Sequence, residues 1–199
     1  MRTRVVALSM LVVAGIVVAG IVVATRPVHH ERQYPERFGF GRIATAEEIR
    51  TADSDVRPDG RGLPHDSGTV AAGELVYEQR CVRCHGATGV EGPFNKLVGR
   101  MPGDSFNFGR DPKLLPLRTI GSYWPYATTL YDYVNRAMPF DSPGSLKPHD
   151  VYSVVAYLLN RNRIIPANAV MNEHTLPAVA MPSRNRFVPD NRRGGREIR

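Results

Sequence analysis

The sequence predicts an all-α domain with an apolar segment at its N-terminal end and irregular extensions on both sides. Three observations lead to this prediction. Apolar residues recur at helical spacing in residues 71–81, 126–137 and 150–161. The stretch between the first two of these, residues 86–125, is rich in glycine and proline and has no sustained period. The two cysteines of the chain lie only two residues apart, at the end of the first predicted helix.

Residues 1–25 are expected to direct the chain out of the cytoplasm. Arg2 and Arg4 precede a run from Val5 to Ala24 that holds no charged residue. A membrane-spanning helix needs about 20 apolar residues, whereas the core of a cleaved signal peptide has about 7 to 15. We therefore expect residues 5–24 to anchor the protein in the inner membrane, with the rest on the periplasmic side. Small residues end the run, so a cleaved signal and a soluble periplasmic protein are the alternative.

Residues 26–68 are predicted to form an extended lead segment between the membrane and the domain. Arg, Asp, Gly and Pro dominate its composition, most clearly in residues 53–64. The one short helical period begins at Thr45, and Thr45 and Glu48 have the spacing of a capping box.

The basic residues of the chain are concentrated at its ends. The formal net charge is +7, but two arginines precede the apolar run and six lie in the last 16 residues. The remaining 18 basic and 17 acidic residues nearly cancel, which disfavours a nucleic-acid-binding protein, because that class clusters basic residues on a folded face. Residues 166–199 are predicted to be an irregular basic tail. We expect the tail and the lead segment to wrap around a partner.

The predicted domain covers residues 69–165. Its second helix ends at Met138-Pro139, because the residue before a proline disfavours helical geometry. Its third helix opens at Lys147-Pro-His-Asp, where proline suits the first turn. The long irregular stretch between the first two helices is unusual inside a domain unless a ligand organises it.

The sequence Cys81-Val82-Arg83-Cys84-His85 fits the attachment motif of a c-type haem with no departure. Two thiols at this spacing reach the two vinyl groups of one porphyrin edge, and the adjacent histidine then lies over the iron. A disulfide in so small a loop would remove little chain entropy. A thioredoxin-like pair requires a βαβ context, and a structural zinc site requires two further ligands, for which His29-His30 is the candidate. The motif therefore predicts one covalent haem c, with His85 as an iron ligand.

The sixth iron ligand is predicted to be Met138. The candidates downstream of the motif are Met101, Met138, His149, Met171, His174 and Met181. Met138 comes 53 residues after His85, which allows the chain to reach the opposite face of the haem, whereas Met101 comes only 16 residues after it. Core packing is the alternative role for this methionine. His/Met ligation implies a high reduction potential and leaves no open iron position, so the protein is predicted to transfer electrons without being an enzyme.

Residues 73–159 resemble class I cytochromes c. Gly73 and Tyr77 stand where that family pairs its first helix with its last, here at about Tyr157. Residues 92–100 are similar to the loop that supports the proximal histidine. The resemblance thus implies an all-α class I cytochrome c domain.

The same resemblance assigns roles to residues around the haem. It implies that the Pro93 carbonyl accepts the ring N–H of His85 and that Arg100 lies near a haem propionate. On chemistry alone, a solvated surface charge is an equal interpretation of Arg100. Trp124, the only tryptophan, is expected to pack on the haem or to bond a propionate, with core packing as the alternative.

A closer resemblance covers most of the chain after the apolar run. It is carried by residues 38–45, 55–64, 121–133, 136–140 and 178–184. Together they are similar to the cytochrome subunit of Sox-type sulfane dehydrogenases and related sulfite dehydrogenases. The resemblance implies that the cytochrome takes electrons from a molybdenum-cofactor subunit that oxidises sulfur, and that Met138 matches the distal methionine. Some family members carry a second haem domain, whereas this chain has one Cys-x-x-Cys-His motif.

Three functions follow as hypotheses. The first is a monohaem cytochrome that accepts electrons from a periplasmic sulfur-compound dehydrogenase and passes them to a downstream cytochrome or oxidase. The second is a free-standing, membrane-tethered carrier that feeds a terminal oxidase. The third is a gas-binding or catalytic haem protein, which applies if Met138 is not an iron ligand.

Overall fold

The computed structural model of the protein describes residues 38–106, 108, 113 and 117–188. The predicted anchor at residues 5–24 and the end of the basic tail lie outside these residues. None of the helices in the described ranges is both long enough and apolar enough to cross a membrane. The chain divides into two units, residues 1–44 and 45–199, and the second contains the helices and strands described below.

A short helix, α2 (Ala46–Ala52), lies in the lead segment. The Thr45 hydroxyl accepts a hydrogen bond from the Glu48 backbone N–H at 3.2 Å. The Thr45 backbone N–H donates in turn to the Glu48 carboxylate at 2.8 Å. This reciprocal pair confirms the predicted capping box, which satisfies two amides that the first helical turn leaves unpaired. The helix buries no residue of its own.

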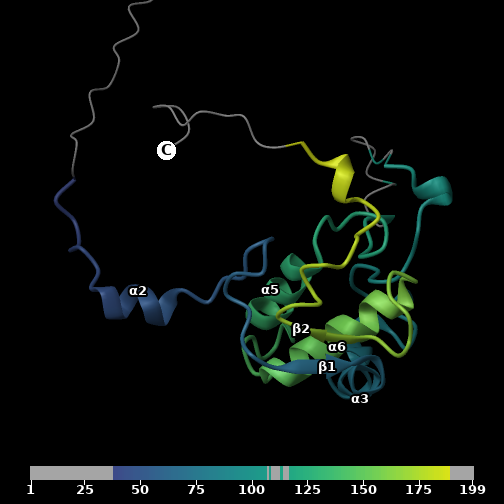
Figure 1. Ribbon diagram of the computed structural model, residues 1–199, viewed down its shortest axis with the longest axis horizontal. Helices are drawn as coiled ribbons and strands as arrows, with labels where there is room; N and C mark the ends of the chain where they lie inside the picture. The colour runs from purple at the N-terminus through teal and green to yellow at the C-terminus, as the bar shows by residue number, and fades with distance from the viewer. Residues whose placement is uncertain (1–37, 107, 109–112, 114–116, 189–199) are drawn as a thin grey trace, which may run out of the picture. The chain divides into compact units, whose positions relative to one another are not determined.

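Three longer helices form the body of the protein (Figure 1). They are α3 (Val70–Arg80), α5 (Ala127–Ala137) and α6 (Pro148–Arg161). All three were predicted, and their ends differ by at most two residues from the expected ones. Helix α6 is the centre of the core, because each of its residues from Val151 to Leu159 is buried. Both α3 and α5 pack against it.

Helices α3 and α6 cross in very close contact at Gly73. A Cβ atom at this position would lie 1.8 Å from the Ser153 carbonyl oxygen and 2.8 Å from the Tyr157 Cβ. One turn later, the Tyr77 ring packs 5.2 Å from the Tyr157 ring, and Tyr77 is only 1% exposed. The pairing of Gly73 and Tyr77 with the last helix is thereby confirmed.

The folded body is larger than the segment 69–165 that the sequence predicts. Two short strands, β1 (Ser67–Thr69) and β2 (Val170–Asn172), pair antiparallel beside α6, so the all-α body also contains one strand pair. The segment after β2 returns to the core, where Met171 and Met181 are each 4% exposed. Sequence periodicity does not reveal these residues, because each is an isolated apolar side chain in an irregular, proline-containing segment. Only tertiary contacts bury them.

Shorter elements complete the body. They are the one-turn helix α4 (Val82–His85) and the 3₁₀ turns η1 (Pro102–Asp104) and η3 (Arg184–Arg186).

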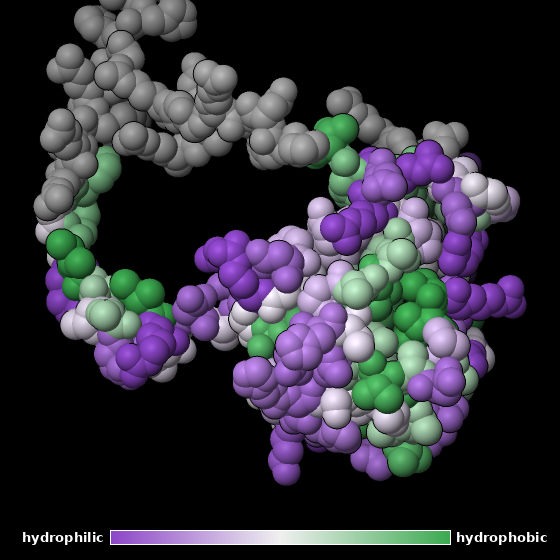
Figure 2. All heavy atoms as spheres, viewed as in Figure 1, coloured by the Kyte–Doolittle hydropathy of each residue, from purple (hydrophilic) through white to green (hydrophobic). Residues whose placement is uncertain are grey.

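Figure 2 shows that hydrophobic residues gather in the middle of one face of the body, among hydrophilic ones. An exposed apolar area of this kind marks a binding surface in many proteins.

Candidate functional site

The Cys-x-x-Cys-His motif is delivered by the end of α3. Cys81 caps this helix and donates its backbone N–H to the Tyr77 carbonyl at 2.8 Å. The Cys84 and His85 amides then donate to the Cys81 carbonyl at 3.1 and 2.9 Å, so the three residues lie on one turn of chain. The Tyr77 hydroxyl donates to the Gly86 carbonyl at 2.9 Å and ties the helix to the end of the motif.

The environment of Cys81 does not favour a reactive thiolate. Cys81 and Cys84 are half-buried and form no disulfide. Burial raises the pKa of the Cys81 thiol to about 11. A redox-active Cys-x-x-Cys pair works through a thiol whose pKa is lowered instead. The described residues also contain no group of three or more His, Cys, Asp or Glu side chains suited to a metal ion. His29-His30, the candidate zinc ligands, lie outside these residues.

The His85 ring is oriented by a carbonyl other than the predicted one. Its Nδ1 lies 3.2 Å from the Asn95 carbonyl oxygen, whereas the resemblance had assigned this bond to Pro93. The path of the chain explains the correction. Gly92 packs so closely that a Cβ there would lie 2.1 Å from the Cys84 carbonyl oxygen, and the chain reaches the ring three residues later. With Nδ1–H donating to Asn95, the Nε2 lone pair of His85 is the one available to iron.

Four of the six candidate sixth ligands have other contacts in the structure. Met171 and Met181 are core residues. The Nδ1 of His149 lies 2.6 Å from the Ser67 carbonyl oxygen. The Nε2 of His174 lies 3.5 Å from the Glu173 carboxylate. Burial in the core disfavours Met171 and Met181, and the contacts of the two histidines place them beside the β1–β2 strand pair. Met101 and Met138 are the candidates without such a placement.

Met138 lies in the segment that the structure brings beside the motif. It is the C-cap of α5 and packs half-buried against the core. Three residues further on, Asp141 forms an ion pair with Arg83, which stands between the two cysteines. Met101 instead precedes η1, which is part of the loop around Arg100. The arrangement favours Met138, and its ligation of iron stays a prediction.

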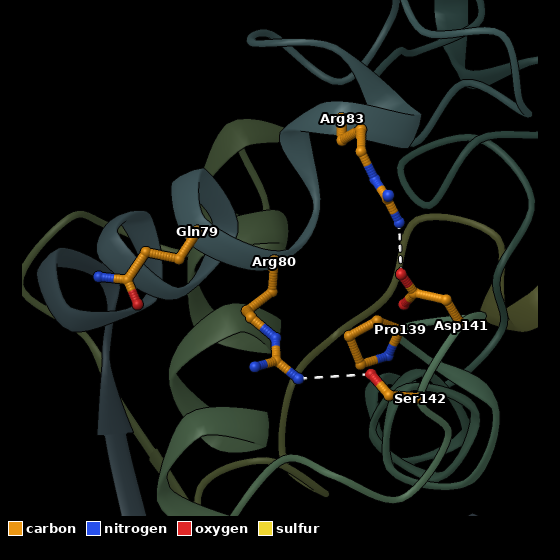
Figure 3. A pocket seen from close by; sticks show the side chains of 6 residues that line it. All are labelled: Gln79, Arg80, Arg83, Pro139, Asp141 and Ser142. Atoms are coloured by element: carbon orange, nitrogen blue, oxygen red, sulfur yellow. Dashed lines mark hydrogen bonds and ion pairs between the residues drawn. The ribbon is translucent and has the colours of Figure 1, made fainter.

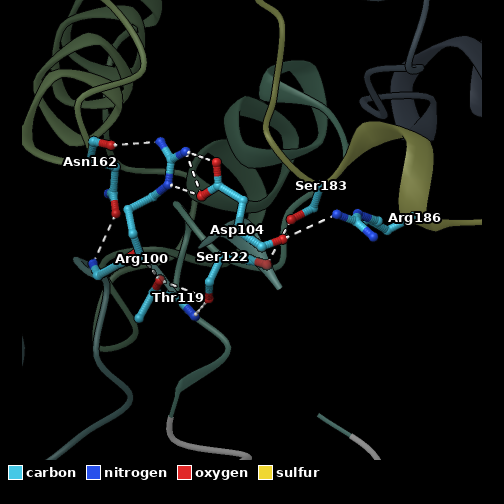
Figure 4. A network of polar contacts seen from close by, with 8 residues as sticks. Arg100, Asp104, Thr119, Ser122, Asn162, Ser183 and Arg186 are labelled. Carbon is cyan, nitrogen blue, oxygen red and sulfur yellow. Dashed lines mark hydrogen bonds and ion pairs between the residues drawn. The ribbon is translucent and has the colours of Figure 1, made fainter. Parts of the chain in front are cut away.

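Arg100 belongs to a polar network at the far end of α6 (Figure 4). Its guanidinium makes three contacts of 2.6 to 2.8 Å with the Asp104 carboxylate. The Arg100 side chain is thus paired with a carboxylate of the protein itself. Its predicted position beside a propionate stays a prediction.

Asn162 is the buried centre of the same network. Its side-chain amide donates to the carbonyls of Leu97 and Leu158 at 3.2 and 2.8 Å, and its side-chain oxygen accepts the Gly99 N–H at 3.0 Å. The Thr119 hydroxyl donates to the Gly99 carbonyl at 2.7 Å. Hydrogen bonds to Asn162 and to Thr119 therefore hold the loop that precedes Arg100.

Trp124 packs partly against the core, with its ring edge-on to Tyr133 at 5.7 Å. This position agrees with the core-packing alternative.

The residues present fit a covalently bound haem. Two thiols and an oriented imidazole lie on one turn, and a thioether lies in a segment that contacts this turn. Several apolar side chains pack on the core but keep part of their surface exposed, and a bound haem could cover that surface. They are Val82, Leu97, Trp124, Met138 and Leu146. The long irregular stretch at residues 86–125 has the length to surround such a group.

Sequence reasoning missed Asn95, Asn162 and the pairing of Arg83 with Asp141. Asn95 acts through its backbone carbonyl, so its side chain carries no signal. Asn162 follows the last apolar position of α6, which marks it only as a helix end. Asp141 lies 58 residues from Arg83 in the sequence, and neither residue has a pattern that identifies its partner.

Comparisons with known proteins indicate a cytochrome c domain. Residues 68–158 match the family model described as cytochrome C oxidase, cbb3-type, subunit III. The chain is also similar to a chain in the crystal structure of the sulfane dehydrogenase SoxCD from Paracoccus pantotrophus. The two are 39% identical with a TM-score of 0.64, over 78% of this chain and 73% of that one. The second similarity extends well beyond residues 68–158 and so includes parts of the extensions.

Proposed function

Because this chain belongs to the class I cytochrome c family and is related to a cytochrome of sulfane dehydrogenase SoxCD, we propose that it is a monohaem electron-transfer protein. Cys81 and Cys84 attach the haem, and His85 and Met138 are the two axial ligands. The observation that carries this proposal is the single turn that presents both thiols and the oriented imidazole. A bound haem c supplies reversible one-electron chemistry at its iron.

The protein's own residues prepare the site for electron transfer. The Asn95 carbonyl holds the His85 ring in one orientation, which also makes the ring a stronger ligand. Met138 fills the sixth position, so that no site for substrate remains. Partly buried apolar residues such as Val82 and Met138 would keep water from a bound haem, which favours a high reduction potential. The chain itself then makes and breaks no bond in a substrate.

We further propose that the electron donor is the molybdenum-cofactor subunit of a periplasmic sulfur-compound dehydrogenase. The similarity to the SoxCD chain supports this donor, because it includes segments outside the haem domain. The proposed place of the protein is the periplasmic side of the inner membrane, anchored by residues 5–24. A carrier that serves a terminal oxidase is the second candidate, favoured by the description of the matching family model. That match is confined to residues 68–158.

Replacing Met138 by alanine is expected to remove the methionine–iron bond. The wild-type protein, matured with haem in a suitable host, should show one covalent low-spin haem with the weak red absorption band of methionine ligation. Met138→Ala should lose this band, and its reduced form should bind carbon monoxide readily because the sixth position is open. Absorption spectra of the oxidised and reduced forms measure both effects.

Met101→Leu is the matched control, because Met101 is the other remaining candidate and is also half-buried. It should keep the red band. Loss of the band in Met101→Leu, with Met138→Ala unchanged, would assign the ligand to Met101. Absence of the band in the wild type would favour the gas-binding or catalytic hypothesis.

The donor assignment predicts substrate-dependent reduction of this cytochrome. The molybdenum-cofactor dehydrogenase of the same source, purified separately, should reduce the ferric protein when sulfite or a sulfane-sulfur compound is added. The reduction is followed by haem absorbance, and omission of the sulfur compound is the control. A carrier dedicated to a terminal oxidase would stay ferric in this mixture and would be oxidised rapidly by membranes once reduced chemically.

A further inference from the structure

The loop between α5 and α6, residues 138–147, has few apolar anchors. Pro139 is buried and Leu146 is half-buried, but Phe140 is 80% exposed. Gly144 adopts a φ of +71° with no atom near its Cβ position. A loop with so little buried apolar area opens easily unless other contacts hold it.

Two arginines of the motif region make those contacts (Figure 3). Arg83 forms an ion pair with Asp141. Arg80 donates to the Ser145 hydroxyl at 2.9 Å and to the Ser142 hydroxyl at 3.4 Å. Within the described parts of the chain, no other hydrogen bond or ion pair joins this loop to residues 79–86.

Both arginines are sequence neighbours of the cysteines, which a covalent haem would hold in place. Arg80 directly precedes Cys81, and Arg83 lies between the two cysteines. Residues that make these contacts also line an open hollow on the surface. Its lining residues are Gln79, Arg80, Arg83, Pro139, Asp141 and Ser142. The loop that supplies Pro139, Asp141 and Ser142 to this hollow begins at Met138, the C-cap of α5.

We propose that Arg80 and Arg83 latch the Met138 loop onto the haem-attachment motif and thereby position Met138 as the sixth iron ligand. The inference rests on the proposed ligation by Met138. The two arginines are positioning residues, because they act on the iron only through the loop. The Arg83 and Asp141 side chains are 77% and 58% exposed, and an exposed ion pair contributes little to the stability of a whole domain. Loss of this ion pair is therefore expected to increase local opening of the loop and to change global unfolding little.

Competition by an added ligand measures this local opening. Imidazole binds the ferric iron only when Met138 leaves it, so its apparent affinity reports how often the loop opens. Asp141→Asn and Arg80→Gln should each raise the affinity for imidazole roughly threefold, and the double variant roughly tenfold, if the two contacts act independently. Global unfolding by denaturant should change little in these variants. The measurement uses the full-length protein with its haem and the red methionine band.

Glu47→Gln is the matched control, because it breaks an exposed ion pair with Arg50 in α2, which buries no residue of the core. Its imidazole affinity should equal that of the wild type. Salt provides a second measurement that needs no change at the motif. Higher ionic strength screens an exposed ion pair, so it should raise imidazole affinity in the wild type and have a much smaller effect in Asp141→Asn.

The outcomes separate this inference from the ligand assignment. A wild type with the methionine band, whose imidazole affinity is the same in all variants and at all salt concentrations, would overturn the latch and leave Met138 as ligand. A wild type without the band would overturn both. If Arg80→Gln lowers haem attachment, the comparison of wild type with Asp141→Asn at low and high salt decides the question.

Discussion

Gly73→Ala is expected to destabilise the protein by about 3 kcal/mol, the upper end of the usual cost of overpacking. The added Cβ would lie 1.8 Å from the Ser153 carbonyl oxygen and 2.4 Å from its carbonyl carbon, and both are backbone atoms of the central helix. Helices α3 and α6 would have to separate to admit it. Helix propensity acts in the opposite direction, since alanine is favoured over glycine by about 1 kcal/mol inside a helix. A loss of stability therefore comes from the helix contact alone.

Denaturant unfolding of the haem-containing protein measures the change in free energy. Ala71→Gly, at an exposed position of the same helix, is the control and should cost only about 1 kcal/mol. Ser153→Gly should not rescue Gly73→Ala, because the obstructing atoms belong to the backbone. A Gly73→Ala variant as stable as the wild type would contradict the close crossing of α3 and α6.

Asn162→Leu is expected to cost roughly 2–4 kcal/mol, because it leaves buried backbone groups without partners. Asn162 is 1% exposed and its side chain uses both its donor group and its acceptor. Leucine has a similar size but cannot accept the Gly99 N–H or donate to the Leu97 carbonyl. The loop before Arg100 would lose its attachment to α6 together with this stability.

Asn160→Leu is the matched control at the same end of α6. Its side-chain amide makes one hydrogen bond, to the Ile165 carbonyl at 3.0 Å, at a half-buried position. The expected cost is about 1 kcal/mol. Denaturant unfolding measures the loss of stability in both variants. Equal losses would show that the buried network at Asn162 contributes no more to the free energy of unfolding than one half-buried hydrogen bond.

The parts of the fold that the sequence predicted are those with a local pattern. Helix α6 was visible because its apolar residues recur with helical spacing, and α2 because Thr45 and Glu48 have the spacing of a capping box. The resemblance to class I cytochromes c correctly paired Gly73 with the last helix. The irregular segment after residue 165 carried no such pattern, and its burial was not predicted.

The candidate site likewise has a part that the sequence predicted and a part that it did not. Cys81, Cys84 and His85 lie within five consecutive residues, so the Cys-x-x-Cys-His motif was readable from the sequence. The partner of the His85 ring was assigned to Pro93, but it is the Asn95 carbonyl. Every residue has a carbonyl, so only the path of the chain decides which one reaches the ring.

The sequence by itself determined the Cys-x-x-Cys-His motif, the three main helices and the family. These features depend on residues that are close in the chain and on chemistry that tolerates few alternatives. Tertiary structure alone decided the burial of Met171 and Met181, the network at Asn162 and the contact of Arg83 with Asp141. These contacts join residues that are distant in sequence, and single polar or apolar side chains without a period do not identify their partners. Their positions follow from how the helices pack, and that packing is a property of the whole folded body.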